Sequence, residues 1–220
     1  MTATLEQALS LQERDDAMTK IMIASQPMTD GQMENLVDKF RAAVRRHRAE
    51  FSLDAVQQVL GIENLGMECL APFRARVEAI SNLIVRRVTV NRTCTPQEAI
   101  DATGRTQYTD RTIVDAMPRG EGEETEVIFF NLGRYVSDDN LDKEYELCGL
   151  IPADPYSLAA VNEADPTFAD DHPNATHWKD SSGKWCYAAF DRFDDDERGV
   201  FVSRSGDGWH DAWWFAGLRK

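Results

Sequence analysis

The side chains in this sequence that could do chemistry are mostly carboxylates and histidines in its second half. Asp170, Asp171 and His172, with His177 nearby, are of the types that bind zinc, and the run DDDE at 194–197 offers the oxygen ligands that calcium prefers. The run lacks the spacing and the glycine of an EF-hand loop, and acidic loops are more often simply solvated. We therefore expect no bound metal and no cofactor.

Motifs for catalysis or phosphate binding are absent from the sequence. It contains no G-x-S-x-G elbow, no P-loop and no G-x-G-x-x-G. Cys69, Cys94, Cys148 and Cys186 are far apart and form no C-x-x-C pair, so they predict no zinc knuckle or redox motif. Four buried free thiols are the simplest interpretation, and a Cys148–Cys186 disulfide is the alternative. We expect a protein that is not an enzyme.

The last thirty residues, DRFDDDERGVFVSRSGDGWHDAWWFAGLRK, are the least ordinary part of the chain. Successive side chains of a strand point to opposite faces, so a strand at 198–204 would bury Val200 and Val202 on one face. The other face would then present Gly199, Phe201, Ser203 and Ser205. A phenylalanine among glycine and serine residues suits a contact surface better than a core.

Large aromatic residues follow in the same stretch. Trp209, Trp213, Trp214 and Phe215 are of the type enriched where proteins bind other proteins or sugars. They could equally form the core of a small domain. That alternative is stronger for Trp214 and Phe215 than for Trp209 and Phe201.

The segments WCYAAFDRF (185–193) and WWFAGLRK (213–220), separated by an irregular polar stretch, resemble the end of a C-type-lectin fold. Such folds occur in the variable proteins of diversity-generating retroelements and in formylglycine-generating-enzyme-like domains. The resemblance covers residues 95–220 and extends to proteins of uncultivated bacterial lineages or their viruses. It implies a fixed scaffold that holds variable residues on one face to bind a target.

In such retroelements, miscopied adenines diversify asparagine codons toward a restricted set of residue types. The positions here that have allowed types are Asp191, Asp194, Gly199, Phe201, Ser203, Ser205, Gly206, Gly208, His210 and Ala212. Together with Trp209, these are the candidate ligand-binding residues. The enzymatic branch of the fold needs a working cysteine pair or copper-binding thiols, and neither Cys148 nor Cys186 has a partner nearby in sequence.

Residues 1–94 are expected to be a helical region. Apolar residues recur at helical spacing in residues 5–22 and 36–47, Thr29 is an N-cap candidate, and further helices are expected at 52–60 and 65–84, with Pro72 near a bend. The run 83–90 could be a strand or could prolong the last helix. The arginines at 41–48 give one helix a basic face, which could be a solvated surface, meet an acidic partner helix or dock onto the acidic second half. The N-terminal helices could also mediate a homo-oligomer.

Residues 95–220 are expected to form an α+β domain with a small mixed or antiparallel sheet. Caps and prolines predict helices at 95–104, 109–118, 141–148 and 156–164, with Asp138-Asp139-Asn140 as a cap for the third. Strands are expected at 127–130, 184–190, 198–204 and 213–219.

The charge of −14 is concentrated in the second half. Residues 1–100 carry 12 basic and 13 acidic side chains, whereas residues 101–220 carry 12 and 25. This argues against nucleic acid as a ligand, because phosphate backbones are bound by clustered Lys and Arg. It also allows two other functions: an acidic mimic of nucleic acid that inhibits a nucleic-acid-binding protein, or an orphan enzyme that uses the carboxylates.

The sequence contains neither a signal peptide nor a membrane-spanning apolar run. We therefore expect a cytoplasmic or virion-associated protein that has no contact with a membrane. Its expected partner is a protein or carbohydrate target.

Overall fold

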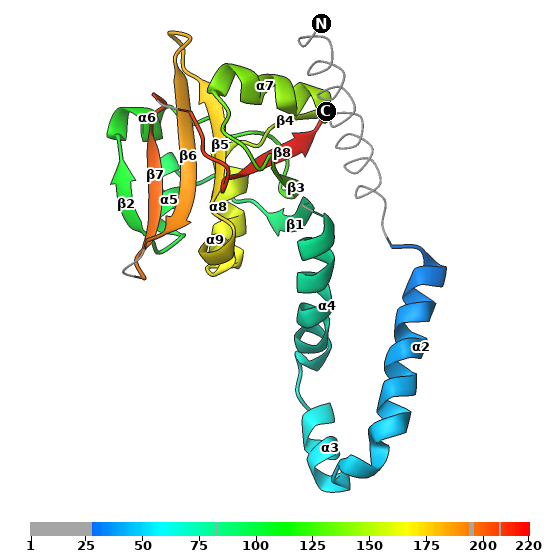
Figure 1. The fold of residues 1–220 in the computed structure, drawn as a ribbon. Coiled ribbons are helices and arrows are strands. Elements are labelled where there is room, and N and C mark those ends of the chain that lie inside the picture. Colours follow the sequence, from blue (N-terminus) through cyan, green and yellow to red (C-terminus); the bar gives the residue numbers. More distant parts are fainter. Residues whose placement is uncertain (1–27, 82, 194–195, 207) are drawn as a thin grey trace, which may run out of the picture. The chain divides into compact units, whose positions relative to one another are not determined.

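The computed structural model describes residues 28–81, 83–193, 196–206 and 208–220. These residues form two units, a helical one up to Ser81 and an α+β one that follows it (Figure 1). The helices expected in residues 5–22 lie outside the described residues. No helix in the described part of the chain is both long enough and apolar enough to cross a membrane.

The helical unit contains α2 (Asp30–His47), a short 3₁₀ turn (Arg48–Glu50), α3 (Leu53–Leu60) and α4 (Leu65–Ser81). Thr29 caps α2 through a capping box with Gln32, in which the two residues satisfy each other's backbone N–H groups. The helix α3 ends at Gly61, as predicted, and Pro72 lies inside α4. The helical character expected for this region is therefore confirmed over residues 30–81.

The α+β unit begins with a strand, β1 (Leu83–Thr89), which settles the question that residues 83–90 left open. It pairs antiparallel with β3 (Glu124–Asn131) from Leu83↔Phe130 to Thr89↔Glu124. The division between the two units therefore follows Ser81 and does not lie at residues 94–95. The change in charge near residue 100 predicted a boundary that is too late in the sequence, because β1 is a partly exposed strand with its own charged residues.

One eight-stranded mixed sheet organises this unit, in the order β1-β3-β8-β5-β6-β7-β2, with β4 also paired to β8. The pairs β2–β7 and β5–β8 are parallel, and the remaining pairs are antiparallel. The other strands are β2 (Thr106–Thr109), β4 (Leu150–Pro152), β5 (Asn174–Lys179), β6 (Trp185–Arg192), β7 (Arg198–Arg204) and β8 (Trp214–Arg219).

Short helices cover one face of this sheet. They are α5 (Pro96–Asp101), α6 (Arg111–Asp115), α8 (Pro155–Ala164) and α9 (Phe168–Asp171), and Figure 1 shows α5 behind β6 and β7 and α8 by β5. Thr95, Asp110 and Asp154 accept hydrogen bonds from the first-turn N–H groups of α5, α6 and α8, as N-caps do. The helix α7 (Asp138–Leu147) stands apart from this group and packs near β4.

The core lies between these helices and the sheet. It includes Phe129, Phe190 and Val202 from the strands and Leu158 from α8, each with 0% exposure. The sheet face opposite these helices is the one that concerns function.

The position of the boundary can be tested by truncation. A chain that starts at residue 82 should keep the stability of the α+β unit. A chain that starts at residue 95 should fail to fold, because it lacks the buried side chains of Leu83, Ile84 and Val88. Each fully buried aliphatic side chain contributes about 1.5–3 kcal/mol. Urea unfolding followed by circular dichroism measures the stability of the two fragments. Equal stability would contradict the assignment of β1 to this unit.

Candidate functional site

The register of β6 and β7 separates two sets of side chains. Val200 and Val202 have 0% exposure and face the helix-covered core, as the sequence predicts. The residues of the opposite parity pair across the strands as Asp191↔Gly199, Ala189↔Phe201 and Tyr187↔Ser203, and Tyr108 of β2 pairs with Phe201. Their side chains therefore share the face of the sheet that α5 and α8 do not cover.

Three aromatic rings cluster on this face. Tyr108 stacks on Phe201 with ring centroids 5.2 Å apart, and Phe193 meets both rings edge-on at 5.7 Å and 5.6 Å. Tyr108 is 47% exposed and Phe193 is 36% exposed. The Tyr108 hydroxyl donates a hydrogen bond to Glu197 at 2.7 Å. Gly199 lies beneath the rings, because a Cβ there would come within 3.0 Å of Phe193 and 3.2 Å of Phe201. We call Tyr108, Tyr187, Phe193, Phe201 and Ser203 the aromatic face.

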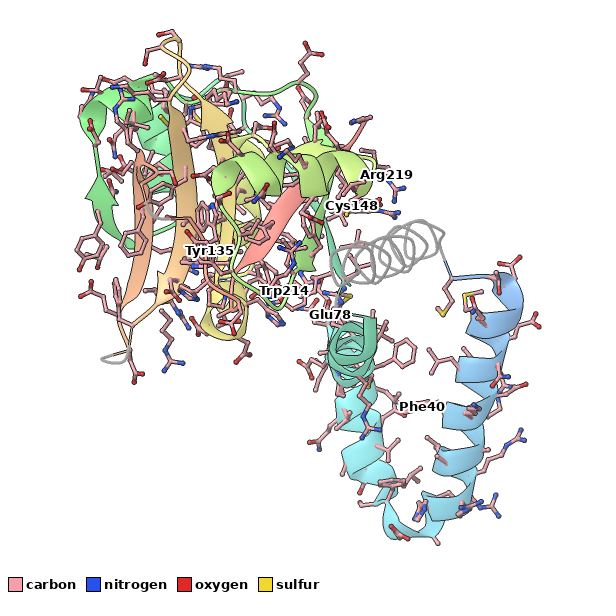
Figure 2. The ribbon with its side chains drawn as sticks, turned by 45° about the horizontal axis from the view of Figure 1, so that its top comes forward. Phe40, Glu78, Tyr135, Cys148, Trp214 and Arg219 are labelled. Atoms are coloured by element: carbon pink, nitrogen blue, oxygen red, sulfur yellow. The ribbon has the colours of Figure 1, made fainter. Side chains whose placement is uncertain are left out.

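The segment 205–213, apart from residue 207, borders this face and is held in part by a backbone bridge, in which Val136 and Trp209 exchange N–H···O bonds of 2.9 Å and 2.8 Å. Gly208 has a φ of 73°, and a Cβ on it would lie 2.6 Å from the Tyr135 hydroxyl oxygen. Only glycine tolerates both conditions. Tyr135 is labelled in Figure 2, where it lies on the viewer's side of the sheet.

Trp209 is a correction to the candidate ligand-binding set. Its side chain is only 5% exposed, and it contacts Tyr187, Trp213 and Phe215 at centroid distances of 5.4, 5.4 and 5.8 Å. Its indole N–H donates to Asp138 at 2.9 Å. A buried indole needs such a partner, so Trp209 anchors the segment and does not contact a ligand directly.

The buried carboxylate of Asp138 lies beneath the segment 205–213 and holds several elements together. Its Oδ1 accepts from Trp209 and lies 3.0 Å from Nδ1 of His177, and its Oδ2 accepts from the Ser205 hydroxyl. Burial alone would raise the pKa of this carboxyl, but the hydrogen bonds from His177, Ser205 and Trp209 outweigh burial and hold the pKa below its ordinary value. The carboxylate therefore joins α7, β5, the end of β7 and the segment 205–213.

The structure corrects the role predicted for Asp138. It is the first residue of α7, with Ser137 at the N-cap position, and its side chain points into the protein. The sequence pattern identified the helix start but could not show that the carboxylate serves distant strands.

His177 lies beneath Trp185, whose ring stacks on it at 4.3 Å, and it is 1% exposed. Ser205, Asp138 and His177 are the residue types of a hydrolytic triad, but a triad places histidine between serine and aspartate. Here both Ser205 and His177 bond to Asp138, and His177 Nε2 has no partner among the described residues. The arrangement therefore gives the Ser205 hydroxyl no base.

The remaining candidates lie around the aromatic face with different degrees of exposure. Asp191 is partly buried, and burial raises the pKa of its carboxyl, although the Arg192 N–H and nearby His210 oppose the rise. His210 is exposed and accepts from the Trp213 indole at 3.0 Å. Gly206 and Ala212 are also exposed, Gly199 is buried under the rings, and Asp194 lies outside the described residues.

Sequence reasoning missed Tyr108, Tyr187 and Phe193 as members of this face. Tyr108 arrives through the parallel pairing of β2 with β7, which joins segments about ninety residues apart. No local pattern in the sequence reports such a pairing. Tyr187 could have been found by extending the alternation from β7 to its antiparallel neighbour.

The alternative metal ligands have other partners. Asp170 accepts two hydrogen bonds from Arg198, at 2.8 Å and 2.6 Å, and His177 belongs to the Asp138 cluster. Within the described ranges, no three His, Cys, Asp or Glu side chains gather as a metal site would require. Asp194 and Asp195 lie outside those ranges.

All four cysteines are free thiols, so the disulfide alternative is wrong in this structure. Their expected burial holds only for Cys186, because Cys94 and Cys148 are partly exposed and Cys69 is exposed. Burial raises the pKa of the Cys148 thiol to about 12, which leaves it protonated and unreactive.

Comparison with protein-family models, curated proteins and solved structures finds no match for this chain. The fold and the site define an α+β protein with a helical N-terminal region and an aromatic surface on its sheet.

The Asp138 cluster makes stability depend on pH. We expect Asp138→Asn to lower the unfolding free energy by about 2–3 kcal/mol at neutral pH, because charge-assisted hydrogen bonds to a buried carboxylate are lost. The pKa is lower in the folded state, so the contribution is present above the unfolded pKa of ~3.9 and is lost as pH falls through the folded value.

The matched control is Asp139→Asn, the same change one residue along at an exposed side chain, where the asparagine Oδ1 can still accept the hydrogen bond that the Trp185 indole N–H donates at 2.9 Å. Urea unfolding at several pH values measures both variants. If Asp138→Asn and Asp139→Asn destabilised the protein equally at neutral pH, the assigned role of the cluster would be wrong.

Proposed function

We propose that residues 83–220 form a ligand-binding module that recognises a protein or carbohydrate target through the aromatic face. The proposal rests on how the side chains of β7 divide between a buried face and an exposed face of the sheet. Val200 and Val202 are completely buried, whereas Phe201 and Ser203 between and beside them remain partly exposed. A strand that needed only to support a core would have no use for a large aromatic residue on its open side.

The composition of the face supports this proposal. Tyrosine and phenylalanine present a large contact area at a small cost in side-chain entropy, and binding hot spots are enriched in aromatic residues. The rings of Tyr108, Phe193 and Phe201 already brace one another, so little order has to be imposed when a target binds. Asp191, Ser203 and His210 add polar groups around them.

The division between scaffold and surface also favours the diversified-surface interpretation suggested by the resemblance to retroelement variable proteins. Asp191, Gly199, Phe201 and Ser203 fall on one face through their register. The segment that carries Gly206, Gly208, His210 and Ala212 borders that face through the Val136–Trp209 bridge. Substitutions at the exposed positions would alter the surface while the valines and Trp209 kept the fold. Gly199 and Gly208 belong with this scaffold and not with the variable positions, because a side chain at either one would clash with its neighbours.

The acidic-mimic alternative gains less support. Several carboxylates of the domain are paired with arginine, including Asp154 with Arg92 at 2.8 Å, Asp170 with Arg198 at 2.6 Å, and Glu126 with Arg219 at 2.8 Å. Paired carboxylates do not imitate a row of phosphates. The enzyme alternative, including the formylglycine-generating-enzyme-like branch, would need a reactive group that neither Cys148 nor Ser205 supplies in this geometry.

Mutation should distinguish the residues that form the core of the domain from the residues that form its binding surface. Val202→Asp should unfold the domain, because an unpaired charge in the core costs several kcal/mol. Phe201→Ala and His210→Ala should each lower the unfolding free energy by only about 1 kcal/mol, since both side chains are partly or fully exposed. A loss of ~3 kcal/mol or more in both alanine variants would place them in the core and contradict the proposal.

Binding is tested by screening the labelled chain against immobilised panels of glycans and of folded proteins. For a target held by this face, Phe201→Ala and Tyr108→Ala should weaken binding by about tenfold or more. Ile151→Ala is the matched control, because Ile151 is 45% exposed on β4, away from these strands. Binding that falls steeply with salt and ignores the aromatic variants would favour the acidic mimic instead.

A further inference from the structure

The helix α2 carries an apolar stripe that nothing in the described structure buries. Met33, Val37, Phe40 and Val44 are spaced by three or four residues and are between 44% and 60% exposed. At about 100° per residue they lie along one line of the helix. None of the eighteen residues of α2, all of which the structure describes, is buried. Amphipathic helices owe most of their stability to packing of such a stripe.

Charged residues flank this stripe in a definite order. About 50–90° to one side of it lie Asp30 and Glu34 near the start of the helix, and Arg41 and Arg48 near its end. Arg41 also contacts Asp38 at 2.5 Å, an exposed pair that is worth little. This flank is therefore acidic in its first half and basic in its second half.

We propose that α2 pairs antiparallel with α2 of a second copy of this chain, stripe against stripe. A two-fold axis perpendicular to both helices places each flank against the same flank of its partner, running in the opposite direction. Asp30 and Glu34 of one copy then lie near Arg41 and Arg48 of the other. A parallel pair would instead set this flank against the opposite flank of its partner, where Leu36, Ala43 and His47 offer the acids and the arginines no complementary charge order.

The order of charges along this flank explains why the partner that covers the apolar stripe is a second copy of the chain. A flank that changes sign at its middle is complementary to its own reversed image, so one sequence supplies both sides of the contact. The interface of such a pair is isologous and contains the phenylalanine Phe40 near its centre. The helix spans about 27 Å, enough for several turns of interlocking side chains.

Sedimentation equilibrium of the full-length chain tests the proposal, with circular dichroism to confirm that each variant keeps its helix. We expect a dimer whose dissociation constant rises about tenfold or more in Arg41→Glu/Arg48→Glu. The matched control is Lys39→Glu/Arg46→Glu, which makes the same change of charge on the opposite side of α2 and should leave the constant nearly unchanged.

A mixing experiment distinguishes lost complementarity from lost folding. Asp30→Lys/Glu34→Lys should also dissociate alone, and mixing it with Arg41→Glu/Arg48→Glu should restore association as a heterodimer. A full-length chain that stays monomeric, or a dimer weakened equally by the flank and control variants, would overturn the proposal. So would a dimer that Phe40→Glu leaves intact. A monomer with a protected stripe would show that another part of the same chain covers it.

Discussion

The border of the aromatic face depends on one buried carboxylate. Asp138 begins α7, yet its oxygens bind a histidine of β5, a serine at the end of β7 and an indole in the segment 205–213. A buried carboxylate is tolerated only when donors satisfy it, so these elements are constrained together. The result is a segment that Trp209 anchors, while its exposed residues Gly206, His210 and Ala212 can differ without loss of the fold.

The aromatic face and the core share the same strands, and the two-residue period of a β-strand keeps them apart. On β7, Val200 and Val202 meet the core, while Gly199, Phe201 and Ser203 pair with Asp191, Tyr108 and Tyr187 of the neighbouring strands. Core packing therefore restricts one set of residues and leaves the other to respond to a target. The helical unit differs from the α+β unit, because many of its described apolar side chains are exposed, and helices of this kind gain most of their stability when such side chains are packed.

Local patterns predicted the parts of this protein that depend on nearby residues. The caps at Thr29, Thr95 and Asp154, the valine alternation of β7 and the α+β class are confirmed. What sequence reasoning missed depends on pairings between distant segments: β1 with β3, β2 with β7, and Asp138 with Trp209. Trp209 illustrates the difficulty, because a tryptophan in a polar segment looks like a contact residue until its partner carboxylate is known.

The most direct test of this account is hydrogen exchange of the tryptophan indole N–H groups, followed by NMR at neutral pH. If Asp138 holds Trp209 as the structure indicates, the Trp209 indole proton should exchange as slowly as core amides such as that of Phe129. The Trp185 and Trp213 indoles donate to the exposed side chains of Asp139 and His210 and are themselves partly exposed, so their N–H protons should exchange much faster. Exchange of the Trp209 proton as fast as theirs would show that the segment 205–213 is not anchored, and would contradict the proposed fixed scaffold.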